Sequence, residues 1–186
     1  MTMAVMESAV SLTQYLSFTL ESETFAMEIG QVREVLDYTS VTKVPQMPSF
    51  VRGVINLRGS VVPVVDLKRK FGMGLTESGL NTCIIIVDVE IEGGNAVLGI
   101  LADSVQEVFS LDRTEIEPMP RMGTRMRLDF LKGMGRRDDE FVQIMDVGRV
   151  FTDMEMLSVH AAAAMGTHEK ATSATGAVIS LGEGGI

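Results

Sequence analysis

The chain has 186 residues, 46% of them hydrophobic and 22% charged, which is typical of a folded protein of one domain or two small subdomains. Its formal net charge of −9 disfavours nucleic acid or an anionic membrane surface as the main partner, because both require a basic surface. The single cysteine, Cys83, excludes an internal disulfide and fits a reducing cytoplasm. No signal peptide is recognisable, and acidic residues and glycines interrupt the most apolar stretch, residues 82–102, so we expect no direct insertion into a membrane.

Short elements fill the first part of the chain. Residues 1–12 are expected to be a flexible N-terminus. Alternation of polar and apolar side chains predicts half-buried strands at residues 14–20 and 24–29. Apolar residues at helical spacing then predict a short helical turn over residues 30–37.

An apolar hairpin is predicted at residues 50–57 and 60–66, with the polar tip Asn56-Leu-Arg-Gly59 between its strands. Asn and Gly are favourable turn residues, but a turn does not require an arginine. Pro63 lacks a backbone donor, so its strand is expected to lie at an edge or to bulge there.

The second part of the chain continues the β pattern. A β-branched run at residues 82–89 predicts a strand buried on both faces, with residues 96–101 as its partner. One substantial helix is expected within residues 145–165, followed by a disordered low-complexity tail over residues 166–186.

The chain also contains an internal repeat. At an offset of 80 residues, VVPVVDLKRKF at 61–71 matches FVQIMDVGRVF at 141–151, and Gly53 matches Gly133. Upstream, an offset of 73 pairs Val32-Arg-Glu-Val35 with Val105-Gln-Glu-Val108. The repeat predicts two units of about five strands, each suited to a small closed barrel, that bury a core only by packing together.

The repeat bears on the role of Arg58. The first tip, residues 56–59, aligns with Arg136-Arg-Asp-Asp139, so the tip differs between the copies while the flanking strands agree. We interpret this as evidence that the fold does not demand an arginine at position 58, which favours a contact with a partner.

Catalytic chemistry is not expected. The two histidines have no metal-ligand spacing to a cysteine or carboxylate, and Cys83 lies in the most apolar strand. Asp66 and Asp146 recur where a strand meets a possible helical turn, which predicts N-caps rather than a catalytic pair. The sequence therefore predicts no enzyme, no metal site and no cofactor.

From about residue 14 to about residue 157, the sequence resembles the chemotaxis coupling proteins of the CheW family. The resemblance is carried by Val32-Arg-Glu-Val35, by the Asn56-Leu-Arg-Gly59 tip and by the following VVPVVDL strand. It implies a mainly β fold of two intertwined, SH3-like five-stranded barrels with short helices and a C-terminal helix. It also implies a non-catalytic cytoplasmic adaptor that couples the tips of methyl-accepting chemotaxis receptors to the regulatory domain of the histidine kinase CheA, recruited to membrane-bound receptor clusters.

The resemblance also implies site residues. Glu34 and Val35 match the family's exposed turn that faces the kinase. The family's receptor-binding groove between the barrels corresponds here to Val32, Arg58, Gly59, Cys83, Ile84, Gly99, Val105 and Val108. For Ile84, Val105 and Val108 a core role stays open beside a contact role, and Gly99 could serve only close backbone approach. Cys83 stands where the family usually has a β-branched residue.

Two arrangements of a CheW-like domain stay open at this point. Residues 13–157 are expected to form the domain of a stand-alone adaptor, and residues 158–186 a helix end and tail. The alternative is a scaffold domain of another two-component pathway, either a CheV-type coupler or a fragment of a kinase regulatory domain. A CheV would carry a phosphoacceptor domain after this region, and a kinase would carry ATP-binding motifs before it; the chain shows neither, which favours the adaptor.

Overall fold

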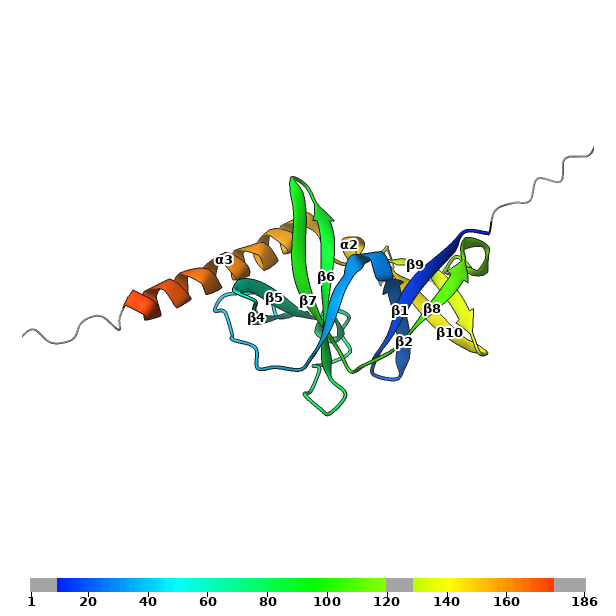
Figure 1. The fold of residues 1–186 in the computed structure, drawn as a ribbon, viewed down its shortest axis with the longest axis horizontal. Coiled ribbons are helices and arrows are strands. Elements are labelled where there is room, and N and C mark those ends of the chain that lie inside the picture. The colour runs from blue at the N-terminus through cyan, green and yellow to red at the C-terminus, as the bar shows by residue number, and fades with distance from the viewer. Residues whose placement is uncertain (1–9, 120–128, 176–186) are drawn as a thin grey trace, which may run out of the picture.

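The computed structural model describes residues 10–119 and 129–175, with side chains described up to residue 165. Within these ranges, two five-stranded sheets pack side by side and a long helix extends from them (Figure 1). The terminal sheet has the order β8-β1-β2-β10-β9, with β1 (Leu12–Leu20), β2 (Glu23–Glu28), β8 (Ser104–Asp112), β9 (Leu131–Arg137) and β10 (Glu140–Met145). The middle sheet has the order β3-β6-β7-β5-β4, with β3 (Val32–Asp37), β4 (Val51–Leu57), β5 (Ser60–Asp66), β6 (Cys83–Ile91) and β7 (Gly94–Ala102). The helices are α1 (Leu67–Lys70), α2 (Val147–Val150) and α3 (Asp153–Thr175), and short 3-10 turns lie at Ile29–Gln31 and Arg113–Glu115.

The two sheets share one topology, and each combines strands from both copies of the repeat. The first copy supplies β1 to β5 and the second supplies β6 to β10. The β1–β2 hairpin joins β8, β9 and β10, whereas the β6–β7 hairpin joins β3, β4 and β5. In each sheet the hairpin's second strand pairs in parallel with the last strand of the other copy, β2 with β10 and β7 with β5. The mainly β, intertwined fold is therefore confirmed, but one repeat unit does not form one sheet, because the copies exchange their first hairpins.

The two sheets were expected to close into barrels, but neither forms a continuous closed barrel. In each sheet, the segment after one edge strand reaches the opposite edge strand through one isolated bridge, Thr42 with Val54 and Glu117 with Met134. A Cβ on Gly53 would lie 2.0 Å from the Thr42 carbonyl oxygen, and a Cβ on Gly133 would lie 2.4 Å from that of Glu117. These two glycines recur in the repeat because a side chain would break the one bridge between the edges.

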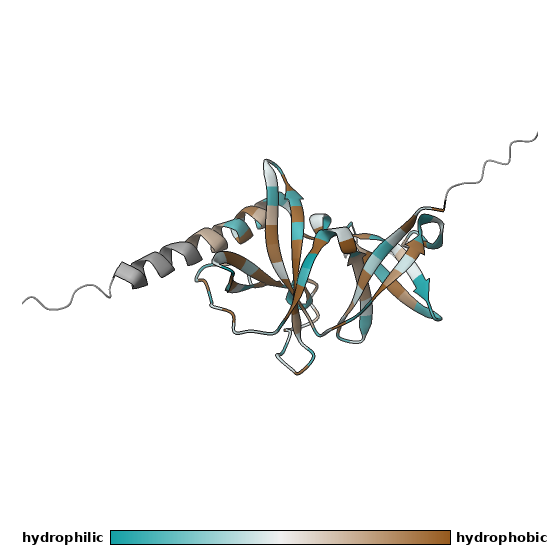
Figure 2. Ribbon diagram, viewed as in Figure 1, coloured by the Kyte–Doolittle hydropathy of each residue, from teal (hydrophilic) through white to brown (hydrophobic). Residues whose placement is uncertain are grey.

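Three hydrophobic clusters hold this arrangement together. The largest lies between the two sheets and includes Phe18 and Ile85. A second lies within the terminal sheet around Ile144, and a third lies within the middle sheet around Ile84 and Leu101. Hydrophobic and hydrophilic residues alternate along several strands in Figure 2. The first half of β6 is instead apolar on both faces, so Ile85 packs in the cluster between the sheets and Ile84 in the cluster of the middle sheet.

The two strand-end aspartates are N-caps, as predicted. Asp66 accepts hydrogen bonds from the backbone N–H of Lys68 (3.1 Å) and Arg69 (3.4 Å) at the start of α1. Asp146 accepts one from the N–H of Gly148 (3.1 Å) at the start of α2. Both caps satisfy backbone donors that a helix start would otherwise leave unpaired.

Two expectations about secondary structure need correction. Residues 32–37 form strand β3, not a helical turn, because Val35 lies on the exposed face and the apolar spacing does not mark one buried side. The final helix continues to Thr175, so the first ten residues of the expected tail, 166–175, are helical. Residues 176–186 and 1–9, where disorder was expected, lie outside the described residues.

Pro63 lies where β5 has one paired neighbour. It is opposite Val54 of β4, and β5 pairs with β7 only from Val64 onward. The prediction of an edge strand or a bulge at Pro63 is wrong, because β5 is an interior strand and its register is regular at Pro63, but Pro63 itself has no ladder partner on the β7 side.

No helix among the described residues is long and apolar enough to span a bilayer.

Candidate functional site

The hairpin tip between β4 and β5 is a two-residue turn. Its central residues, Arg58 and Gly59, both have positive φ angles of 48° and 87°, which is the conformation of a type I′ turn. The Asn56 side chain accepts a hydrogen bond from the Gly59 N–H at 3.0 Å and so supports the turn. Positive φ is uncommon for a residue such as arginine, so the position of Arg58 points to a role for its side chain.

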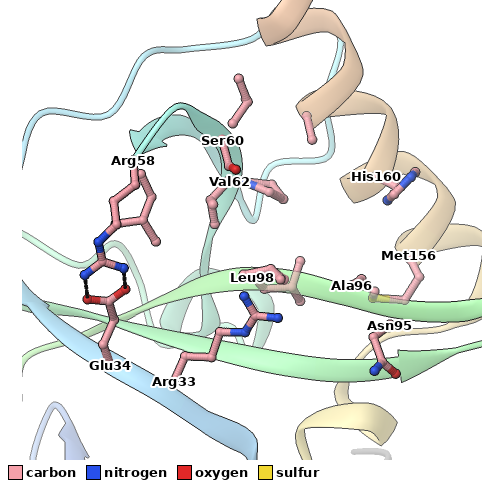
Figure 3. Close-up of a pocket in the computed structure, with 15 residues that line it drawn as sticks. Arg33, Glu34, Arg58, Ser60, Val62, Asn95, Ala96, Leu98, Met156 and His160 are labelled. Carbon is pink, nitrogen blue, oxygen red and sulfur yellow. Dashed lines mark hydrogen bonds and ion pairs between the residues drawn. The ribbon is translucent and has the colours of Figure 1, made fainter.

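The Arg58 side chain binds Glu34 on the neighbouring edge strand. The Arg58 Nη1 and Nη2 atoms donate to Glu34 Oε1 and Oε2 at 2.7 and 2.8 Å, a bidentate pair drawn in Figure 3. This hydrogen bond holds the pKa of the Glu34 carboxyl below its ordinary value. Because Glu34 lies on β3 and Arg58 on the β4–β5 turn, the pair joins the two edges of the middle sheet.

A cavity of about 570 Å³ opens beside this ion pair. We call it the tip cavity; β3, the β4–β5 turn, the first half of β7 and α3 line it (Figure 3). Arg33 points into it, while its Nε donates to Asp88 Oδ2 at 2.6 Å. Arg33 is the extra residue of a β-bulge in β3, which is a common device for re-aiming a side chain. Guanidinium groups beside apolar walls suit recognition of carboxylates or carbonyls on another protein.

The terminal sheet carries a counterpart of this site. Its β9–β10 turn, Asp138–Asp139, has the same pair of positive φ angles, 45° and 65°. Arg137, one residue before the turn, forms an ion pair with Glu107, which the repeat aligns with Glu34. The interpretation that the fold does not demand an arginine here therefore needs revision, because each sheet links its edge strands by an arginine–glutamate pair, from different turn positions.

The valines that follow the two glutamates are also equivalent. Val35 and Val108 are 42% and 47% exposed, so each edge strand presents one apolar side chain to solvent next to its ion pair. Val35 and Glu34, the two predicted kinase-facing residues, are neighbours on β3.

The predicted receptor-groove residues separate into two groups. Val32, Cys83 and Val105 all pack on the cluster between the sheets, and the backbone N–H of Val105 lies against the Cys83 sulfur. Burial raises the pKa of this thiol. Ile84 and Gly99 instead lie inside the middle sheet, because successive residues of a strand point to opposite faces.

Gly99 has a packing role that its neighbours define. A Cβ at this position would lie 2.8 Å from Ile84 Cγ2 and 3.2 Å from Val64 Cγ2, both in the buried cluster of the middle sheet. The glycine thus allows the close approach anticipated from the sequence. Arg58, at the centre of the tip, lines the tip cavity, and neither Arg58 nor Gly59 belongs to the cluster between the sheets.

Sequence reasoning missed four residues of these sites: Arg33, Asp88, Glu107 and Arg137. The repeated V-x-E-V motif could have indicated Glu107 as the partner of a second arginine. No local signal connects Arg33 with Asp88, because 55 positions separate them and only the pairing of β3 with β6 brings them together.

The fold and the site define a class of protein: a β scaffold of two exchanged five-stranded sheets, with exposed edge strands and charged hairpin tips. A family model described as "CheW-like domain" matches residues 14–155. The chain belongs to this family, which confirms the resemblance seen in the sequence.

Individual relatives agree with this assignment. The chemotaxis protein CheW of Klebsiella aerogenes is 32% identical over 146 residues, covering 78% of this chain and 86% of the relative. CheW of Thermotoga maritima is 26% identical over 155 residues, covering 82% and 96%. The crystal structure of the scaffolding protein TtCheW from Thermoanaerobacter tengcongensis is similar with a TM-score of 0.69 and 35% identity, over 81% of this chain and 96% of that one.

Proposed function

We propose that the chain is a chemotaxis adaptor that couples the cytoplasmic tips of methyl-accepting chemotaxis receptors to the regulatory domain of the histidine kinase CheA. It acts in the cytoplasm at membrane-bound receptor clusters, and the proposal assigns it no catalytic step. Membership of the CheW-like family, relatives named as chemotaxis proteins and a similar structure named as a scaffolding protein support this role.

The observation that carries the proposal is the exposed edge at β3. Val35 is accessible there, and Glu34 is fixed in orientation by both nitrogens of Arg58. An apolar side chain next to an oriented charge provides contact area and specificity for a protein partner. The regulatory domain of the kinase binds this edge through Glu34 and Val35.

The receptor tip, a helical hairpin, binds between the sheets. Val32 and Val105, both partly exposed, form the apolar wall together with the buried Cys83, and Val108 is an exposed apolar contact on β8. Arg58 and Gly59 contribute at the margin. Ile84 and Gly99 act from behind this wall, since their side of the sheet is buried, and set the packing that positions it.

The substitution Glu34→Lys tests the kinase-binding edge. It places two cations together at the tip and removes the oriented carboxylate, so binding of the isolated kinase regulatory domain should fall by about tenfold or more. Receptor-fragment binding should change by no more than about twofold. Pull-downs with each partner separately provide the measurement.

Glu107→Lys is the matched control, because it breaks the equivalent pair in the terminal sheet. It should leave kinase-domain binding intact. Equal loss of kinase binding in both variants would mean that the edge at β3 is not the kinase site.

A further inference from the structure

A second groove lies between the tip of the β6–β7 hairpin and the start of α3. It has a volume of about 570 Å³, and we call it the hairpin–helix groove. Its apolar floor includes Ile91, Phe151, Met156 and Leu157. Leu157 is 67% exposed, so it offers an apolar side chain to a partner that enters the groove.

The rim of this groove is acidic. Glu90 and Glu92 project from the hairpin tip, and Asp153 begins α3. Within residues 10–119 and 129–165 none of the three carboxylates has an ion pair or a hydrogen bond to its side chain, whereas Glu34, Asp88 and Glu155 each pair with an arginine or a lysine. Three uncompensated negative charges around an apolar floor favour a cationic and amphipathic ligand.

We propose that the hairpin–helix groove binds a basic amphipathic segment of another protein, with its apolar side chains on Leu157 and Met156 and its lysines or arginines on the acidic rim. The groove's rim residues differ from the β3 edge residues Glu34 and Val35, whereas its floor residues Ile91, Phe151 and Met156 also pack on the cluster between the sheets. It adjoins the tip cavity through Asn95, Met156 and His160, which line both.

A second copy of the chain is a poorer occupant. The exposed aromatic side chain Phe141 lies next to Arg136, but Asp138, Asp139 and Glu140 surround the pair, so an acidic rim would repel it. The whole chain also carries a net charge of −9, which opposes self-association through acidic surfaces. An anionic membrane is disfavoured by the same charges.

Fluorescence anisotropy tests the proposal at low and moderate salt. The probe is a labelled helical peptide of about 18 residues with leucines on one face and lysines on the other, and its control replaces the lysines by glutamates. The intact chain should bind the lysine peptide and not the glutamate peptide. The double substitution Glu90→Lys with Glu92→Lys should weaken binding by about tenfold, and Leu157→Ser should also weaken it.

A matched double substitution, Glu77→Lys with Glu140→Lys, changes the net charge equally at exposed acidic residues away from the groove. It should alter binding by about twofold at most. Equal weakening by both pairs would show general attraction to an acidic chain and overturn the proposal, as would binding that the groove variants leave unchanged.

Two further readouts locate the ligand. Amide NMR shifts caused by the lysine peptide should concentrate at Gly93, Gly94, Leu157 and His160. In sedimentation equilibrium of the chain alone, the groove substitutions should not change the oligomeric state. A dimer that the groove substitutions abolish would assign the groove to a second copy and contradict the proposal.

Discussion

Arg58 combines an unfavourable backbone conformation with a well-formed side-chain contact. Its positive φ is one that Asn, Asp or Gly adopts more readily, and the second sheet uses two aspartates at the same turn. The sequence singled out Arg58 as odd, but its partner Glu34 could not be found from spacing, because only the approach of two edge strands joins them. The counterpart Glu107–Arg137 shows that linking the edges is part of Arg58's role.

Exchanging the charges of Arg58 and Glu34 distinguishes two roles of Arg58: linking the edge strands and contacting a partner. Arg58→Glu alone should leave the protein folded but abolish receptor-dependent control of the kinase, because two carboxylates then face each other at the tip. Glu34→Arg combined with Arg58→Glu restores an ion pair of reversed orientation. If Arg58 contacts the receptor, binding of the isolated receptor fragment, which does not depend on the kinase-facing Glu34, should stay weak in the double variant, as measured by pull-down. Recovery of receptor-fragment binding would show that the arginine acts only within this protein.

The same pair predicts a pH dependence. Hydrogen bonds from Arg58 favour the charged carboxylate and lower the pKa of Glu34. A carboxyl with a lower pKa in the folded state stabilises the fold above its unfolded pKa, and this contribution is lost as the pH falls through the folded value. In an NMR titration of side-chain carboxyls, Arg58→Gln should raise the pKa of Glu34 toward its ordinary value. If the pKa of Glu34 is the same in Arg58→Gln as in the original chain, the ion pair does not form in solution.

At the scale of elements, the repeat predicted what both copies share and missed how the copies combine. The hairpin of residues 51–57 and 60–66, the recurring glycines and the two N-caps followed from local patterns. The exchange of the first hairpins did not, because strand pairing between copies depends on contacts distant in sequence. Strand β3 was predicted wrongly for a related reason: its structure depends on pairing with β6, whose residues are distant in the sequence.

The two N-caps provide a comparison of stability between equivalent elements. Asp66 is fully buried, and besides capping α1 it accepts hydrogen bonds from Arg52 Nη1 (3.0 Å) and from the Thr76 hydroxyl (2.8 Å). Asp66→Ala should therefore lower the free energy of unfolding by about 3 kcal/mol, because Arg52 loses its buried partner. Asp146→Ala removes an accessible cap and should cost about 1 kcal/mol. Urea unfolding monitored by circular dichroism measures both, and equal losses would refute the buried network.

At the scale of the whole molecule, two similar sheets leave distinct surfaces free at the same time. The β3 edge, the space between the sheets and the hairpin–helix groove present different side chains, although β3 and β6 each contribute to two of these surfaces. An adaptor needs such separation, because each partner must bind without displacing another. Most of the receptor-groove residues were chosen through the family resemblance. The structure divides them into residues that pack on the cluster between the sheets and residues that lie inside the middle sheet, a distinction that depends on which face of its strand each residue occupies.

Reconstitution of the complete coupling reaction tests the adaptor role most directly. Receptor signalling fragments assembled on vesicles are mixed with the kinase CheA, with and without this chain, and both co-sedimentation and autophosphorylation are measured. The kinase should sediment with the receptors, and respond to their state, only when the chain is present. Equal sedimentation and equal kinase activity with and without the chain would contradict a coupling function.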